Sequence, residues 1–267
     1  MTLSLVTLVI ATTTFAQDAK LRRLDTGIDA SAWEAVGRLD IGGEGFCTGA
    51  LIAPDQVLTA AHCLFDKATG DAVDPTKIEF LAGWRNGRAS AYRGVKRAAV
   101  HPDFGGRSDE LTGDVSNDLA ILELDHPIRN GRIKHFETGV RPEVGSSVGV
   151  VSYSKQRSEA PSLQEVCEVL NQREGVLVTS CTVDFGSSGA PIFVFDDGQA
   201  QIVSVVSAKA ELAGENVSLG TSLDAPLAFL KSELASGRGG PGSAGTSVRR
   251  LSVTDEQPDT GAKFIQP

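Results

Sequence analysis

The chain has 267 residues, of which 41% are hydrophobic and 22% are charged. This composition is that of an ordinary globular protein, long enough for one large core or two small ones, and it excludes a fibrous, disordered or membrane-embedded chain. The formal charge of -9 argues against nucleic acid as a partner, because phosphate binding needs a basic surface and no large Lys/Arg cluster is apparent.

The first residues have the pattern of a secretion signal. Residues 2–15 are an apolar stretch too short to span a bilayer, and Thr14 and Ala16 supply small residues for cleavage before Gln17. No Lys or Arg precedes this stretch, so an uncleaved anchor or an earlier start of the chain are the alternatives. We predict that residues 1–16 are a signal peptide and that the protein is secreted or periplasmic, without stable membrane insertion after signal removal.

Beyond a polar lead-in over residues 17–32, apolar segments recur at the spacing of strands, separated by turn-rich segments. Glycine is frequent and aromatic residues are few, which suits many short strands. This spacing favours sandwiches or barrels over a βαβ sheet, so we predict mainly β structure. The segments expected as strands are 35–41, 47–53, 56–60, 77–83, 92–100, 119–125, 148–154, 166–172, 175–181, 190–195 and 201–208.

One helix is expected close to the end of the folded region, over residues 224–234. Asp224 is placed to cap its first turn, and Pro226 fits its beginning. Three leucines at spacings of three and four mark the buried face. They are Leu227, Leu230 and Leu234.

The composition changes after the helix to Gly, Ser, Pro and charged residues. It predicts a flexible tail over residues 236–267, with a pro-segment or an export or docking signal as the functional alternative. The folded domain is therefore expected to span residues 33–235.

Four cysteines, an even number, fit an oxidising compartment. Three pairings are possible, and the local one joins Cys47 to Cys63 and Cys167 to Cys181. Each short loop would contribute about 3 kcal/mol in the chain-entropy treatment. Four reduced buried thiols are the alternative. Neither pair has CxxC spacing and the four histidines are scattered, so we expect no metal site.

Three segments carry residues suited to hydrolysis by an activated serine. A serine hydroxyl is a poor nucleophile near neutral pH, so it needs an imidazole to take its proton and a carboxylate to orient that imidazole. His62 lies in TAAHC, Asp118 lies in NDLAIL at the entry to an apolar strand, and Ser188 lies among small residues in GSSGAP. Ser187 is the rival nucleophile.

TAAHC, NDLAIL and GSSGAP, in this order, resemble the three signatures of the chymotrypsin/trypsin family of serine peptidases. The resemblance covers about residues 33–235. It implies an all-β fold of two six-stranded antiparallel β-barrels, with the catalytic triad in the cleft between them and a short C-terminal helix.

The resemblance also implies the roles of individual residues. His62 would act as general base and then general acid, Asp118 would orient it, and Ser188 would be the nucleophile. The backbone N–H groups of Gly186 and Ser188 would form the oxyanion hole, and glycine is needed at 186 for the turn that points its amide inward. The family disulfide that holds the histidine loop corresponds to Cys47 and Cys63.

Substrate-binding residues follow from the same resemblance. Ser207 matches the position whose hydroxyl contacts the triad aspartate and whose backbone pairs with the bound peptide. Thr182 stands where trypsin carries its pocket Asp, so no strong preference for Arg or Lys is expected. We expect the Lys209 ammonium to stay in solvent, the alternative being attraction of an acidic substrate side chain. The expected pocket walls are Thr182, Val183, Ser207, Ala208, Lys209, Gly220, Thr221 and Ser222.

The residue before the nucleophile departs from the animal members of the family. Their zymogens carry an Asp there, which pairs with a newly released N-terminus, whereas this chain has Ser187 and no IVGG-like segment. It is more similar to bacterial members that lack this Asp, including those like glutamyl endopeptidases. Two activation routes remain as alternatives. The protein is active as soon as it has folded, or it becomes active after cleavage near Arg22 and Arg23.

The sequence therefore predicts a secreted serine endopeptidase that cleaves peptides or proteins through an acyl-enzyme, as a monomer without metal or cofactor. The alternative is a catalytically silent homologue that binds peptides or protein partners, although such members usually lose a triad residue. An α/β-hydrolase esterase is disfavoured, because Ala190 stands where G-x-S-x-G requires glycine and the order of the triad differs.

Overall fold

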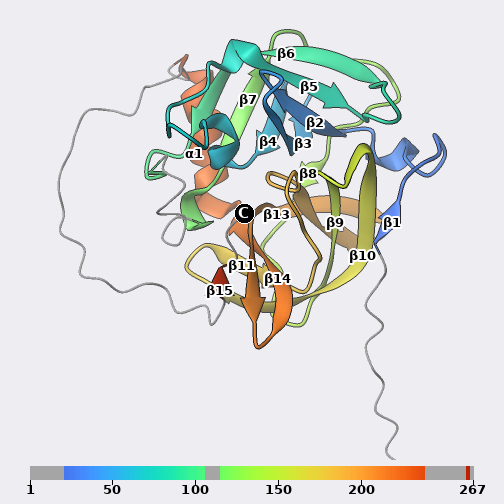
Figure 1. Cartoon of the computed structure of the whole chain (residues 1–267), viewed down its shortest axis with the longest axis vertical. Helices are drawn as coiled ribbons and strands as arrows, with labels where there is room; N and C mark the ends of the chain where they lie inside the picture. Colours follow the sequence, from blue (N-terminus) through green and yellow to red (C-terminus); the bar gives the residue numbers. More distant parts are fainter. Residues whose placement is uncertain (1–20, 106–114, 238–262, 265–267) are drawn as a thin grey trace, which may run out of the picture.

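The computed structural model describes residues 21–105, 115–237 and 263–264, which form two β-barrels and one α-helix (Figure 1). The expected signal peptide lies outside the described residues. So does most of the expected tail, namely residues 238–262 and 265–267.

The first barrel closes six antiparallel strands in the order β2-β3-β4-β7-β6-β5. Its interior is filled by side chains that point inward on alternate positions of each strand, such as Leu39, Leu58 and Ile121, which are fully buried. The strands are β2 (Val36–Ile41), β3 (Gly45–Ala53), β4 (Gln56–Thr59), β5 (Ile78–Ala82), β6 (Ala91–Val100) and β7 (Ala120–Leu124).

The second barrel also contains six antiparallel strands, which pair in the order β9-β10-β11-β14-β13-β12 and back to β9. The predicted fold of two six-stranded barrels is confirmed. The strands are β9 (Ser147–Ser154), β10 (Arg157–Arg173), β11 (Val176–Thr179), β12 (Pro191–Asp196), β13 (Gln199–Leu212) and β14 (Glu215–Ser222). Three two-residue strands join this sheet, β1 (Arg22–Arg23), β8 (Glu137–Thr138) and β15 (Lys263–Phe264).

The predicted helix is α1 (Asp224–Ala235), which leaves the second barrel and packs against β6 and β7 of the first (Figure 1). Its predicted leucine face is buried. The expected cap at Asp224 is wrong, because Leu223 already has helical dihedral angles and occupies the N-cap position without a side-chain hydrogen bond. Asp224 instead lies in the first turn, where a carboxylate is favoured by the helix dipole.

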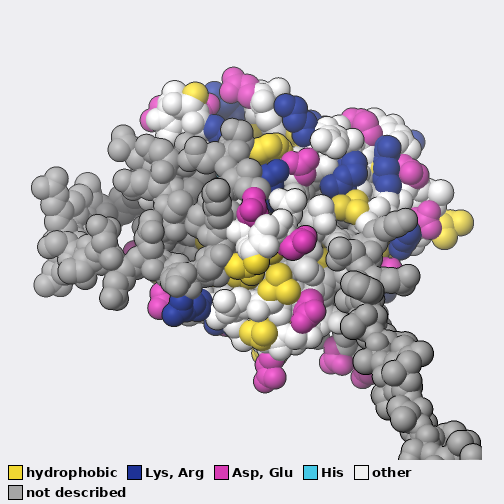
Figure 2. All heavy atoms as spheres, turned by 60° about the horizontal axis from the view of Figure 1, so that its bottom comes forward, with side chains coloured by type: hydrophobic (Ala, Val, Ile, Leu, Met, Phe, Trp, Pro, Cys, Tyr) yellow, Lys and Arg dark blue, Asp and Glu magenta, His cyan; other side chains and the backbone are white. Residues whose placement is uncertain are grey.

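Within the described ranges, four short 3-10 helices lie in the connections, and one of them carries a site residue. They are η1 (Ser31–Trp33), η2 (Ala61–Leu64), η3 (Pro75–Lys77) and η5 (Val115–Asn117). None of the helices in the described ranges is long and apolar enough to cross a bilayer. On the described part of the face shown in Figure 2, acidic and basic side chains are interspersed.

Two segments differ from the sequence prediction. The domain was expected to begin at residue 33, but Leu24 is fully buried and its N–H donates to Pro161 O, so the lead-in already packs on the second barrel. Strand β14 was not predicted, because ENVSLGTS has only Val217 and Leu219 as large apolar residues. Pairing with β11 and β13 on its two sides makes it a strand.

Gly189 connects the Ser188 loop to the first barrel through a tight contact. Its φ is +76°, and a Cβ there would lie 2.1 Å from Thr59 Oγ1 and 2.3 Å from Thr48 O. Gly198 has the same φ of +76°, but a Cβ there would meet nothing within 4 Å. The two positions therefore separate the cost of a left-handed backbone from the cost of steric overlap.

We expect Gly198→Ala to lower the free energy of unfolding by about 1 to 2 kcal/mol, the cost of a left-handed alanine. Gly189→Ala should cost at least about 2 kcal/mol more, because overlap with backbone cannot be relieved by a rotamer change. Urea unfolding followed by circular dichroism checks both values. Equal losses in the two variants would show that the contact at Gly189 is not tight.

Candidate active site

His62 is positioned by η2 and by a disulfide at its neighbour. The Cys47–Cys63 bond joins β3 to η2, and Cys167–Cys181 joins β10 to the segment after β11. Both predicted pairings are confirmed. The two sulfur atoms beside His62 are therefore not available as thiolate ligands, although these three residues are close enough together to be considered for a metal.

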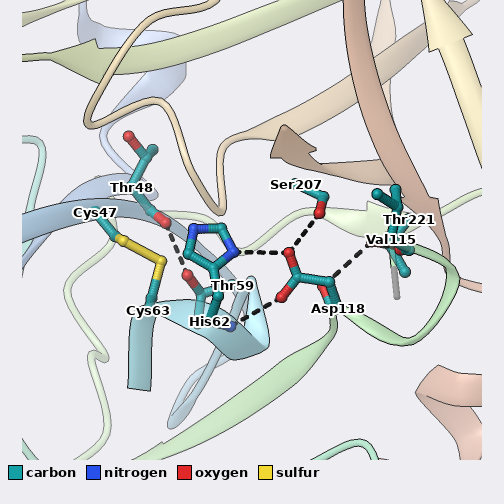
Figure 3. Close-up of polar contacts among 9 residues, drawn as sticks. All are labelled: Cys47, Thr48, Thr59, His62, Cys63, Val115, Asp118, Ser207 and Thr221. Carbon is teal, nitrogen blue, oxygen red and sulfur yellow. Dashed lines mark hydrogen bonds and ion pairs between the residues drawn. A yellow bond between two sulfur atoms is a disulfide. The ribbon is translucent and has the colours of Figure 1, made fainter. Parts of the chain in front are cut away.

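The Asp118 carboxylate binds His62 twice (Figure 3). The His62 backbone N–H donates to Asp118 Oδ1 at 2.8 Å, and the ring Nδ1 lies 2.7 Å from Oδ2. Because a carboxylate only accepts, the proton of a neutral His62 ring belongs on Nδ1. The other ring nitrogen, Nε2, then has a free lone pair, which is the state needed to accept a proton from a nucleophile.

Residues from the second barrel hold Asp118. Ser207 on β13 donates its hydroxyl to Asp118 Oδ2 at 2.5 Å, and Asp118 is almost completely buried, with 1% of its surface exposed. Thr221 on β14 donates to Val115 O at 2.5 Å and to Asp118 O at 3.2 Å. The second barrel thus fixes the position of a carboxylate that the first barrel supplies (Figure 3). The sequence had suggested Thr221 as part of the pocket wall and gave no signal for these contacts.

The loop that carries Ser188 depends on a glycine. Gly186 has φ +95°, and a Cβ there would lie 2.4 Å from Phe46 Cε2. Ser188 is partly exposed. Among the described residues, neither the Gly186 N–H nor the Ser188 N–H donates a hydrogen bond, whereas the Ser187 N–H and Gly189 N–H both have acceptors. Two free amide donors therefore flank the candidate nucleophile.

Thr48 on β3 fixes the same loop from the first barrel. Its N–H donates to Ser188 O and its hydroxyl donates to Gly186 O, both at 2.8 Å. With both carbonyls directed toward Thr48, the loop is held by the first barrel on its carbonyl side. Thr48 follows the disulfide residue Cys47 directly, but the sequence offered no signal for this function.

Ser187, the rival nucleophile, is fully buried. Its hydroxyl can donate to Ser152 Oγ and to Tyr153 O, each 3.2 Å away. The same hydroxyl accepts from the Asp184 N–H at 3.3 Å. A hydroxyl enclosed by three protein partners has no access to a substrate. The burial of Ser187 therefore favours Ser188 as the candidate nucleophile. The hydrogen bonds of Ser187 stabilise the loop.

No hydrogen bond joins the Ser188 hydroxyl to the His62 ring among the residues that the structure describes. Catalytic hydrogen bonds are often long without substrate and shorten in the reacting complex. The loop of Ser188 is nevertheless connected to His62 through β13. Gly189 N–H donates to Val206 O. The next residue of β13, Ser207, donates to Asp118, which in turn binds His62.

The residues predicted to line the pocket differ in their exposure to solvent. Thr182 is exposed and its N–H donates to Gln164 Oε1 at 2.8 Å, while Val183 and Ala208 are partly buried. Gly220 is buried, and a Cβ there would meet Ser204 Oγ at 2.3 Å, so this predicted pocket position has no room for a side chain. Gly220 is therefore needed for interior packing.

Lys209 also differs from expectation. Its ammonium was expected to stay in solvent, but it lies 3.6 Å from Asp184 Oδ1 and 5.1 Å from the centre of the Phe185 ring. The ion pair and the aromatic ring draw the side chain onto the loop that precedes Ser188, so part of its charge is compensated within the protein.

The family model described as Trypsin matches residues 27–221. The chain belongs to the trypsin family. Among curated relatives of this trypsin-like protein, the glutamyl endopeptidase of Bacillus licheniformis is 27% identical over 56% of this chain and 45% of its own length. Rat serine protease 23 is 27% identical over 55% of this chain and 43% of its own. The chain thus spans less than half the length of these two relatives.

A trypsin of Simulium vittatum is 30% identical over 60% of this chain and 69% of its own length. Two solved structures share the fold of this trypsin-like chain. A Glu endopeptidase in complex with MPD has a TM-score of 0.64 at 16% identity, covering 83% of this chain and 98% of the other. A scabies mite inactivated protease paralogue has a TM-score of 0.65 at 18% identity with the same coverage.

We expect Ser187→Ala to reduce the rate of Ser188 labelling by a fluorophosphonate about 10-fold or more. The loop would lose the hydrogen bonds that hold its two free amides in place, and loss of a whole oxyanion donor typically costs 10²–10³ in rate. Stopped-flow or gel-based labelling of the folded protein measures the effect.

The matched control is Ser154→Ala. Ser154 lies on the same strand as Ser152, and its buried hydroxyl makes no hydrogen bond in the described structure. This variant should keep the wild-type labelling rate. A Ser187→Ala protein that also labels at the wild-type rate would rule out a positioning role.

Proposed function

We propose that this trypsin-like protein is a serine endopeptidase whose triad is His62, Asp118 and Ser188. The observation that carries the proposal is a pair of N–H groups, on Gly186 and Ser188, that have no acceptor among the described residues and lie on the same loop as the Ser188 hydroxyl. Both residues are partly exposed, so a substrate can reach these two donors and supply the acceptor.

The chemistry needs only groups of the protein and water. Ser188 Oγ attacks the carbonyl carbon of the peptide bond while His62 Nε2 takes the hydroxyl proton, and the oxygen that becomes negative accepts from the two free amides. His62 passes this proton to the leaving amine as the C–N bond breaks. Water then attacks the acyl-enzyme with His62 as base, which releases the acid and restores Ser188.

Asp118 supports both steps without changing its own protonation. Its carboxylate holds the His62 ring in the tautomer with the proton on Nδ1, and it stabilises the imidazolium that forms. Three donors converge on this carboxylate, from the His62 backbone, the His62 ring and Ser207. A buried carboxylate with three donors keeps one orientation.

We further propose that the preferred residue at the cleaved bond is uncharged. Thr182 supplies no negative charge for an Arg or Lys, and the positive charge of Lys209 is already paired with Asp184. The relatives named as glutamyl endopeptidases make an acidic residue the alternative. A peptide library with all residues at that position distinguishes the three classes.

Export to an oxidising compartment is part of the proposal, with residues 1–16 as signal peptide and the periplasm or the exterior as destination. Two disulfides support it, because such bonds persist where thiols are not kept reduced. The proposed enzyme acts as a monomer on peptides or proteins.

Labelling with a fluorophosphonate, mapped by mass spectrometry, tests the proposed nucleophile. Label is expected on Ser188 of the wild type and absent from Ser188→Ala. Label on Ser187, or none on correctly disulfide-bonded protein, would contradict the assignment. The second result would favour the silent peptide-binding homologue, and titration of the unlabelled protein with peptides would then detect binding without cleavage.

Ser207 and Ser204 lie on one strand with similar hydrogen bonds and different surroundings. Ser207 donates to Asp118, whereas Ser204 donates to Thr221 O at 2.8 Å. We expect Ser207→Ala to lower kcat about 10-fold with little change in KM, because the bond it removes orients the triad carboxylate and is worth about 1.5 kcal/mol.

Ser204→Ala should lose similar stability and keep its kcat. Peptide hydrolysis and thermal unfolding, measured on both variants, provide the comparison. Parallel losses of kcat in the two proteins would show that the effect of Ser207 is one of stability.

A further inference from the structure

Strand β13 changes its environment where it passes the candidate active site. On one side it pairs with β14 from Ser204 to Leu212. On the other side it pairs with β12 only as far as Val205, and Val206 then exchanges hydrogen bonds with the loop after Ser188. From Ser207 onward, β12 no longer covers this second side, so an edge that no barrel strand of the described structure pairs with begins beside the proposed triad.

Such an edge binds extended chains. Its N–H and C=O groups point sideways and pair with any strand that lies alongside, which gives affinity through the main chain. The edge begins at Ser207, whose hydroxyl contacts Asp118, so a peptide that adds to it is carried toward the proposed reaction centre. This is the edge on which the proposed substrate would bind.

Strand β15 occupies part of the same edge. Phe264 pairs with Ala210 and Lys263 with Glu211, both in antiparallel register. Because residue numbers rise along β15 as they fall along β13, β15 is directed toward Lys209 and Ser207. Figure 1 draws β15 on the second barrel, whereas the preceding helix α1 packs on the first.

We propose that the C-terminal segment containing Lys263 and Phe264 is an intramolecular ligand of the substrate-binding edge, which competes with extended peptides for β13. The kinetic part of this inference rests on the proposed peptidase function. The binding part does not, since it concerns only the pairing of β13 with β15. The tail thus has a docking function, where the sequence favoured a free tail.

The expected strength of the effect follows from tethering. A segment linked to its site has an effective concentration of about 1 mM. A short strand that binds its edge with a dissociation constant of about 0.1 to 0.3 mM would then reduce the apparent affinity for a competing peptide roughly 4- to 11-fold. A small substrate that does not extend along β13 past Lys209 should be affected less.

Hydrogen exchange tests the docking without any need for activity. In a Ser188→Ala background, removal of residues 263–267 should speed amide exchange in residues 207–212 of β13. Exchange in residues 199–205, which β12 pairs, should stay unchanged. Equal exchange in the two proteins would overturn the proposal, whether or not the wild type is a peptidase.

Kinetics tests the competition. The truncated protein should have a kcat/KM about 4- to 11-fold higher for a peptide of eight or more residues, with a smaller change for a one-residue ester. Addition of the synthetic peptide GAKFIQP should restore the lower rate, and a scrambled peptide should not. A truncated protein that cleaves the long peptide at the wild-type rate would exclude competition.

A point substitution avoids the loss of several residues. Phe264→Pro removes an amide hydrogen from the paired strand and should behave like the truncation. Gln257→Pro places the same change in the tail, beside the native Pro258 and outside the paired residues, and should behave like the wild type. If neither full-length nor truncated protein reacts with a fluorophosphonate, the proposed function fails while the exchange result still decides the docking.

Discussion

The buried carboxylate of Asp118 is the constraint on which the site depends. It lies at the junction of the two barrels, where His62 binds it from the first and Ser207 from the second. An acceptor withdrawn from water is tolerated only when donors surround it, so both barrels must supply them. The hydrogen bonds that offset the cost of burying Asp118 also fix the orientation of the His62 imidazole. These bonds therefore determine both how the two barrels are placed against each other and the geometry of the proposed catalysis.

A second constraint is the shape of the loop from Asp184 to Ala190. Its turn requires glycine at 186 by dihedral angle and by space, and its interior is held by the neutral hydroxyl of Ser187. In animal zymogens of the family this place belongs to an aspartate that waits for a new N-terminus. Here the hydrogen bonds of the Ser187 hydroxyl with Ser152 and Tyr153 hold the loop instead.

Strand β13 connects these features with the rest of the chain. It supplies the bond from Ser207 to Asp118, it carries Lys209 to the loop residue Asp184, and its open edge pairs with β15. One strand can do all three because its side chains alternate between the two faces while its backbone groups point along the sheet. The proposed triad support, pocket and tail docking are thus not independent, and changes in the course of β13 would affect all of them.

The sequence by itself predicted the family fold, through the resemblance of the three motifs around His62, Asp118 and Ser188, and most of the strands and the leucine face of α1, through local periodicity. It left three disulfide pairings open, and the structure has the local one. Only the tertiary structure decided the roles of Thr48 and Thr221, the pairing of Lys209, the interior position of Gly220 and the strand β14. The reason is distance along the chain: the contacts of Asp118 with His62 and Ser207 span 56 and 89 residues, and that of Thr221 with Val115 spans 106. Whether a small polar residue faces a partner so remote depends on strand register and on the packing of the two barrels, and neither leaves a periodic signal in the sequence.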